Sequence, residues 1–161
     1  MNIKNILVPV DFSTSTDEAV KTAIKLAETL NAKIHLLHVE EDAYRIRQGH
    51  ALTVMDRELL PAIEAFHANM LRECTKKLNN FFHKIPEALR GREEVREGHP
   101  TDMILKYIVE QNIDLVVLGS HGQSNLTDAL LGSTTDRLAR KAPCSVFIVK
   151  DKGRKGTRST V

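Results

Sequence analysis

The sequence lacks an apolar run long enough to cross a membrane. A membrane span needs about 18 uninterrupted apolar residues, and no segment of these 161 residues provides them. The apolar run near the N-terminus is too short for a signal peptide, and Asp11 stands where a small-residue cleavage site would be expected. With 42% apolar and 27% charged residues, the composition is typical of a globular protein, and we expect a cytoplasmic location.

Cysteine is scarce, and its spacing excludes the usual cysteine motifs. Cys74 and Cys144 lie far apart, without the short spacing of a disulfide framework, a redox motif or a zinc finger. We expect two buried, reduced thiols. His35 and His38 would point to opposite faces of a strand, so we do not expect this pair to bind a metal.

The net charge is low and unevenly distributed. The whole chain carries +2, and its last eleven residues, with four basic residues and one acid, carry +3, which leaves −1 for residues 1–150. The body is therefore not expected to bind nucleic acid. Residues 151–161 have no apolar periodicity, so we expect one domain over 1–150 and a basic, disordered tail. Contact of this tail with RNA or anionic lipid remains an alternative.

Strand and helix patterns alternate along the chain. Short apolar runs predict strands at 3–10, 33–39, 113–119 and 145–149, and the charged segment 92–97 is predicted as a fifth strand at a sheet edge. Apolar residues at helical spacing, from Ala19 to Leu30 and from Ile63 to Phe81, predict two helices, of which the second ends before Pro86. Further helices are predicted after Pro100 and from Ser133. The phenylalanines at 66, 81 and 82 are interpreted as packing residues of the second helix. Residues 40–58 show no periodic pattern and are interpreted as a long connection with room for one short element, which the sequence does not place.

This alternation predicts an α/β fold, a doubly wound (Rossmann-like) five-stranded parallel sheet with helices on both faces. Two helix starts have the spacing of a capping pair, Ser15 with Glu18 and Ser133 with Asp136. In such sheets, ligands bind beyond the carboxyl ends of the strands, where the strand order reverses. Three polar segments lie at the carboxyl ends of predicted strands: residues 9–15, residues 38–40 and the loop that begins at Gly119.

The third of these segments has the residues of a phosphate-binding loop. Gly119 and Gly122 follow a buried strand, where they permit a sharp turn and the close approach of a ligand. Gly132 precedes Ser133, Thr134 and Thr135 at a predicted helix N-terminus, where N–H groups and hydroxyls favour an anion. The loop lacks the lysine of a Walker A motif, and residues 8–15 contain no glycine for a dinucleotide fingerprint.

The spacing Gly119-x2-Gly122-x9-Gly132-Ser133 resembles the nucleotide-binding signature of the universal stress protein family. The resemblance extends from ILVPVDFS at 6–13 through LLHV at 36–39 and VVLGSHG at 116–122 to APCSVFIVK at 142–150. It implies a small dimeric α/β protein, of which some members bind ATP. This sequence has the signature intact.

The resemblance also implies roles for particular residues. It assigns adenosine contacts to Asp11 and Val39, with Pro9 and Leu118 lining the pocket. Ribose and phosphates would be contacted by the loop residues Gly119, Gly122, Gly132, Ser133, Thr134 and Thr135. A divalent cation such as Mg²⁺ would bind among the phosphate oxygens of ATP, ADP or AMP. The family's usual homodimer would form through the last strand, Ser145 to Val149.

Structural alternatives stay open for two of these residues. Asp11 could cap the helix that follows it, and Ser133 could be only an N-cap. For the whole protein we consider a nucleotide-binding stress-response regulator, a slow ATPase, and a nucleotide-free, chaperone-like dimer. Efficient hydrolysis is not indicated, because the loop offers neither lysine nor arginine and no catalytic base can be named.

Overall fold

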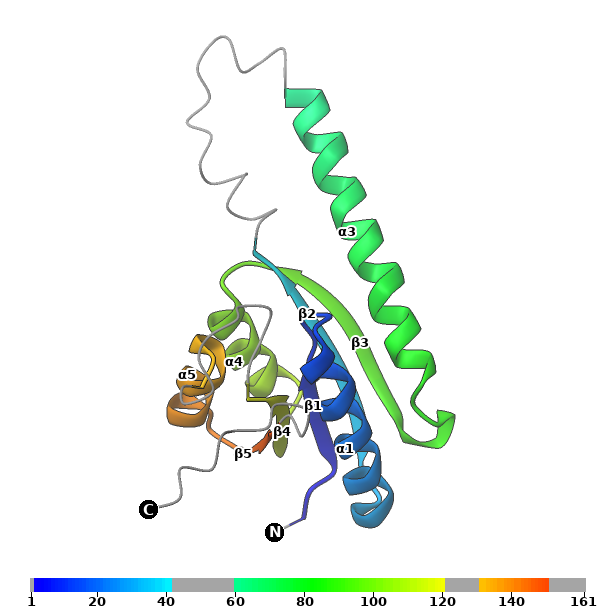
Figure 1. The fold of residues 1–161 in the computed structure, drawn as a ribbon, viewed down its shortest axis with the longest axis vertical. Coiled ribbons are helices and arrows are strands. Elements are labelled where there is room, and N and C mark those ends of the chain that lie inside the picture. The colour runs from blue at the N-terminus through cyan, green and yellow to red at the C-terminus, as the bar shows by residue number, and fades with distance from the viewer. Residues whose placement is uncertain (1, 42–59, 121–130, 151–161) are drawn as a thin grey trace, which may run out of the picture.

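The computed structural model describes residues 2–41, 60–120 and 131–150, and their elements follow the predicted alternation (Figure 1). Five strands are present: β1 (Asn5–Pro9), β2 (Lys33–Glu40), β3 (Arg90–Glu97), β4 (Leu115–Gly119) and β5 (Ser145–Val149). The helices are α1 (Thr14–Leu30), α3 (Leu60–His83), α4 (Pro100–Glu110) and α5 (Ser133–Lys141), with a short 3-10 turn at Glu87–Leu89. The predicted tail at 151–161 lies outside the described residues.

All five strands are parallel, in the order β3-β2-β1-β4-β5. The strand order reverses at β1, which pairs with β2 on one side and β4 on the other. The Asp114 carboxylate accepts hydrogen bonds from the backbone N–H groups of Lys4 (2.8 Å) and Asn5 (2.9 Å), and so joins the starts of β1 and β4. The charged strand β3 lies at a sheet edge, as predicted.

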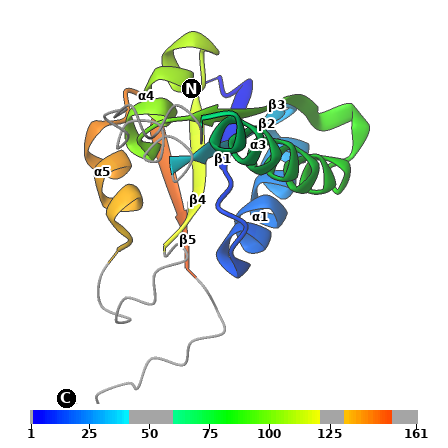
Figure 2. The ribbon, with the colours of Figure 1, turned by 90° about the horizontal axis from the view of Figure 1, so that it is seen from above.

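Two layers of helices cover the sheet (Figure 2). Helices α1 and α3 lie on one face and α4 and α5 on the other. Strand β1 supplies both cores: Ile6 and Val8 pack toward α1, whereas Leu7 packs with Tyr107 of α4 and Leu138 of α5. Each such side chain stabilises the fold by about 1.5–3 kcal/mol when fully buried. The predicted doubly wound fold is therefore confirmed.

Helix α1 fits closely against the sheet because small residues recur on one of its faces. Ala19, Ala23 and Ala27 are fully buried at a spacing of four residues, which places them on one side of the helix. The helix ends at Asn31, which adopts a left-handed φ of 53°, a conformation that asparagine tolerates.

Both predicted capping pairs are wrong. Helix α1 has Ser13 at its N-cap, and Ser15 is buried inside the helix. Helix α5 has Gly132 at its N-cap, so Ser133 is the first helical residue. The observed N-cap therefore lies two residues before the predicted hydroxyl in α1 and one residue before it in α5.

Helix α3 is only partly supported by the sheet. Its 24 residues extend beyond the end of the strands (Figure 1), and Leu78 is the one described residue of the helix that is buried. The prediction that Phe66 packs in the core is wrong, since 58% of it is exposed. Phe81 and Phe82 do pack against the core. None of the described helices is long and apolar enough to cross a bilayer.

Candidate functional site

A cavity of about 460 Å³ opens beyond the carboxyl ends of β1, β2 and β4. It lies where the strand order reverses, which is the expected ligand site of a doubly wound sheet. Its volume falls in the range of small-molecule sites, about 300–1,000 Å³. It is lined by nine residues predicted from the sequence: Pro9, Asp11, Val39, Leu118, Gly119, Gly132, Ser133, Thr134 and Thr135. The tenth, Gly122, lies outside the described residues.

Asp11 organises the turn between β1 and α1. Its Oδ1 accepts hydrogen bonds from the Ser13 backbone N–H (3.0 Å), the Ser13 hydroxyl (2.6 Å) and the Thr16 hydroxyl (2.7 Å). The alternative role of Asp11 in stabilising the start of the helix is therefore present in the structure. A ligand contact is compatible with it, because Asp11 also lines the cavity.

The start of α5 is fixed against the end of β4. The Gly132 N–H donates to the Ser120 carbonyl (2.9 Å), and the Thr135 hydroxyl donates to the Gly119 carbonyl (3.0 Å). Ser133 is exposed, whereas Thr135 is buried. These bonds aim the N-terminus of α5 at the cavity, where its N–H groups and dipole favour an anion.

Other residues that line the cavity had no individual role predicted from the sequence. Ser13, Ser15 and Thr16 bring the N-terminus of α1 to the cavity, and Pro100 brings that of α4. Lys77 of α3 adds a basic side chain. The hydroxyl run STST at 13–16 was a visible signal, since it follows directly after a strand. Nothing in the sequence indicated that Lys77 lines the cavity, because its position depends on how α3 packs against the sheet.

On the side of the cavity toward α3, three residues of types that can ligate a metal lie together: His38, Glu40 and Cys74. Burial and the neighbouring Glu40 raise the pKa of the Cys74 thiol to about 12. His38 and Glu40 alternate along β2 and so share a face, which the sequence could have indicated. Because α3 brings Cys74 to them from 34 residues away, sequence spacing alone did not reveal the cluster.

Comparison with known proteins agrees with the fold. A model of the universal stress protein family matches residues 2–150. The chain belongs to the universal stress protein family. Universal stress protein MJ0577 of Methanocaldococcus jannaschii is 31% identical over 156 residues, which cover 92% of this chain and 96% of that protein.

Solved structures of other members have the same architecture. Universal stress protein UspA from Lactobacillus plantarum, 27% identical, superposes with a TM-score of 0.69 over 92% of this chain and 99% of its own. A universal stress protein from Archaeoglobus fulgidus, described as a complex with dAMP, is 18% identical and superposes with a TM-score of 0.62 over 93% of this chain and 100% of its own. At that identity the likeness establishes a shared fold.

Proposed function

We propose that this universal stress protein binds an adenine nucleotide, with ATP as the main ligand, in the cavity beyond β1, β2 and β4. The observation that carries the proposal is the convergence of three helix N-termini, those of α1, α4 and α5, on one cavity. Each N-terminus presents unsatisfied N–H groups and the positive end of a helix dipole, so an anionic ligand is favoured there. Hydroxyls from α1 and α5 add hydrogen-bond donors around the same space.

The residues divide the cavity into two regions. Pro9, Val39 and Leu118 give an apolar wall suited to a base, and Asp11 can accept hydrogen bonds from the adenosine. The ribose and phosphates are assigned to Gly119, Gly122, Gly132, Ser133, Thr134 and Thr135, with Lys77 as a further cation near the phosphates. The hydroxyl oxygens suit Mg²⁺, which keeps several waters and binds largely through substrate phosphates.

A relative with this fold gives independent support. The structure from Archaeoglobus fulgidus is described as a dAMP complex, so the fold accommodates an adenine nucleotide. The proposal itself rests on the residues that line the cavity of this chain.

We assign the protein a regulatory role in the stress response, with slow or no hydrolysis. Efficient phosphoryl transfer needs several positioned charges around the phosphates, and the described lining contains one lysine and no arginine. Nucleotide occupancy would instead change contacts with partner proteins. The cytoplasmic location expected from the sequence is part of this proposal.

The proposed homodimer forms through β5. This strand is the outer one of the described sheet beyond β4, and Phe147 on it is 45% exposed. An outer strand with an exposed aromatic residue is a liability in a monomer, and pairing with a second copy would cover it. Sedimentation of wild type beside Phe147→Lys tests this, because the charged variant should sediment as a monomer.

Thermal unfolding of nucleotide-stripped protein tests the binding. Mg²⁺ with ATP at about a hundred times its Kd adds roughly 2.7 kcal/mol, which raises the Tm of a domain of this size by about 5–10 °C. GTP should give a smaller rise. Gly132→Val, which adds a branched side chain at the cavity, should remove the ATP effect, whereas Ala139→Val on the exposed side of the same helix should keep it.

The absence of a rise in folded, nucleotide-free wild type would overturn the proposal. A nucleotide-free dimer would then be favoured, with the long helix α3 as its interaction surface. An equal loss in both valine variants would mean that the substitutions act on the stability of α5 rather than on binding.

A further inference from the structure

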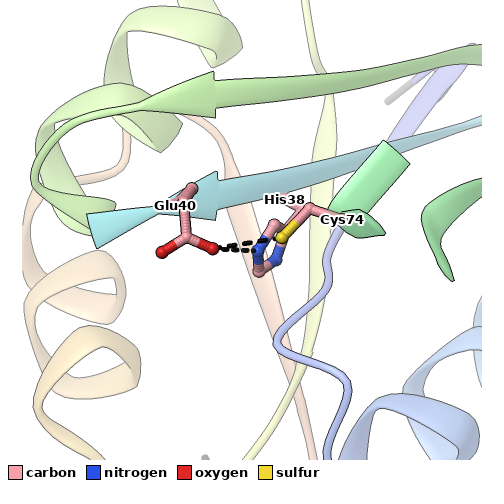
Figure 3. Close-up of side chains that lie close together, drawn as sticks. All are labelled: His38, Glu40 and Cys74. Carbon is pink, nitrogen blue, oxygen red and sulfur yellow. Dashed lines mark hydrogen bonds and ion pairs between the residues drawn. The ribbon is translucent and has the colours of Figure 1, made fainter. Parts of the chain in front are cut away.

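Three potential metal ligands meet between β2 and α3 (Figure 3). The His38 Nε2 lies 3.6 Å from the Glu40 Oε2, and the Cys74 thiol donates a hydrogen bond to the same oxygen at 3.1 Å. All three ligand atoms lie within 4.8 Å of one another. A nitrogen, an oxygen and a sulfur atom are thus already gathered at one point.

The hydrogen bond of His38 fixes which of its nitrogens is available. Its Nδ1 lies 2.7 Å from the Val10 carbonyl oxygen. Because a carbonyl can only accept, Nδ1 carries the proton, and the Nε2 of the neutral ring has a free lone pair. A backbone carbonyl that holds the second ring nitrogen in this way is the usual support of a metal-binding histidine.

His38 Nε2 is also an unexplained buried atom. His38 is 8% exposed, and Nε2 has no hydrogen-bond partner among the described residues. The Glu40 oxygen 3.6 Å away is beyond hydrogen-bond distance, and an unprotonated nitrogen beside a carboxylate oxygen is unfavourable. A cation bound by Nε2 would give this buried nitrogen a partner.

The geometry points to a zinc site in which the His38 Nε2, the Glu40 carboxylate and the Cys74 thiolate bind one Zn²⁺. Zn²⁺ takes all three donor types at about 2.0–2.3 Å in tetrahedral geometry, which separates neighbouring ligand atoms by about 3.4–3.6 Å. The observed 3.6 Å and 3.1 Å separations lie within about half an ångström of these values, and the third pair, Nε2 and Sγ, lies within 4.8 Å. A thiolate and a carboxylate together neutralise the charge of the ion.

A fourth ligand would reach the ion from the cavity, because His38, Glu40 and Cys74 all line it. The Phe12 ring, which also lines the cavity, packs on the imidazole with the two ring centroids 4.4 Å apart. Phe12 adopts a left-handed φ of 61°, which is uncommon for a bulky residue and holds its ring in this place. Water, or an atom of a cavity ligand, would complete the tetrahedron, so this is an open site rather than a closed structural one.

The donor set distinguishes this ion from Mg²⁺. Magnesium requires oxygen ligands in octahedral geometry, whereas a thiolate and an imidazole favour zinc and other softer divalent metals. The inference therefore does not depend on nucleotide binding, and either proposal can fail without the other.

Zinc binding by these residues should strengthen with pH. In the metal-free protein, burial and Glu40 hold the pKa of Cys74 at about 12, with Glu73 adding to this effect and Lys77 opposing it. The thiol is therefore protonated near neutral pH, and zinc must displace that proton. With one proton released, the apparent affinity should rise by up to about tenfold for each pH unit.

Titration with Co²⁺, a spectroscopic substitute for Zn²⁺, tests the site. The protein is the full chain without an affinity tag, stripped with a chelator and kept reduced. We expect one Co²⁺ per chain, a thiolate-to-cobalt charge-transfer band with tetrahedral d–d bands, and loss of both on addition of Zn²⁺. Mg²⁺ should not displace the cobalt.

Matched variants identify the ligands. Cys74→Ser should abolish the charge-transfer band, whereas Cys144→Ser should keep it, because Cys144 packs in the opposite core. His38→Asn retains a side-chain N–H for the Val10 carbonyl but lacks Nε2. His38→Asn and Glu40→Gln should each weaken metal binding more than about a hundredfold, because loss of a residue that only supports a ligand already costs up to about that much. His35→Asn is the control for a buried histidine.

Circular dichroism and thermal unfolding show whether each variant is folded. The inference is overturned if folded, reduced wild type gives no thiolate band, or if the band survives in Cys74→Ser. Unweakened binding in folded His38→Asn would also contradict it, because His38 would then not be a ligand.

Discussion

Replacing Gly91 by alanine should destabilise the protein, mainly through a clash with the His35 ring. Gly91 lies on β3 where the pairing with β2 shifts register, between Ile34 and Leu36. A Cβ there would lie 2.5 Å from Cδ2 and 2.7 Å from Nε2 of the His35 ring. The ring has little room to move, because His35 is 6% exposed and its Nδ1 lies 3.1 Å from the hydroxyl of the fully buried Tyr107.

Two opposing terms set the size of the effect. Forcing an extra carbon into a packed site costs about 1–3 kcal/mol. Alanine also restricts the unfolded chain, which stabilises a strand position without a clash by about 0.4–1 kcal/mol. The free energy of unfolding of Gly91→Ala should therefore fall by about 1–2 kcal/mol, and the Tm by about 2–8 °C.

Urea unfolding in a double-mutant cycle is the appropriate assay. With His35→Ala the ring is gone, so the added cost of Gly91→Ala should largely disappear, which gives a coupling of more than about 0.5 kcal/mol. Equal costs in both backgrounds would refute the clash with the ring. A Gly91→Ala variant as stable as wild type would refute the packing argument altogether.

Two further predictions concern stability. Burial, with Arg92 nearby, lowers the pKa of His35 in the folded protein below its ordinary 6.5. Because the unfolded chain then binds the proton more tightly, the free energy of unfolding should fall as the pH drops below about 6.5. Urea unfolding at about pH 7.5 and about pH 5.5 should show a smaller difference for His35→Gln than for wild type, and equal differences would contradict this. In α3, Leu78→Ala should cost about 2–5 kcal/mol, because Leu78 is 1% exposed. Phe66→Ala should cost less than about 0.5 kcal/mol, because Phe66 is 58% exposed, and similar midpoints for the two variants would mean that α3 packs differently.

The fold and most of the cavity could be predicted because they depend on local patterns. Apolar runs identify buried strands, and the charge of 92–97 identifies an edge strand. Once the strands are parallel, their carboxyl ends share one edge, so residues after β1, β2 and β4 must meet there. The expected placement of His35 and His38 on opposite faces of the sheet is also confirmed, since His35 contacts Tyr107 of α4 and His38 contacts Phe12 on the other side.

What could not be predicted depends on how elements pack together. Cys74 and Lys77 reach the cavity through the position of α3 along the sheet, which no spacing in the sequence specifies. The exposure of Phe66 has the same cause, because helical periodicity shows a face without showing how far the sheet extends beneath it. The N-cap residues were misplaced by one or two positions, since short hydroxyl-rich segments offer several candidate caps.

The central position of β1 has a consequence for synthesis on the ribosome. Its pairing with β2 and its packing against α1 need only the first 40 residues, whereas β4 begins at Leu115. At about 5–20 residues per second, the intervening stretch of about 75 residues takes roughly 4–15 s to translate. During that interval the edge of β1 that pairs with β4 is unpaired, and it can pair with other nascent chains. Although β1 is translated first, its pairing with β4 and its hydrogen bond to the Asp114 carboxylate form only when most of the chain has been translated.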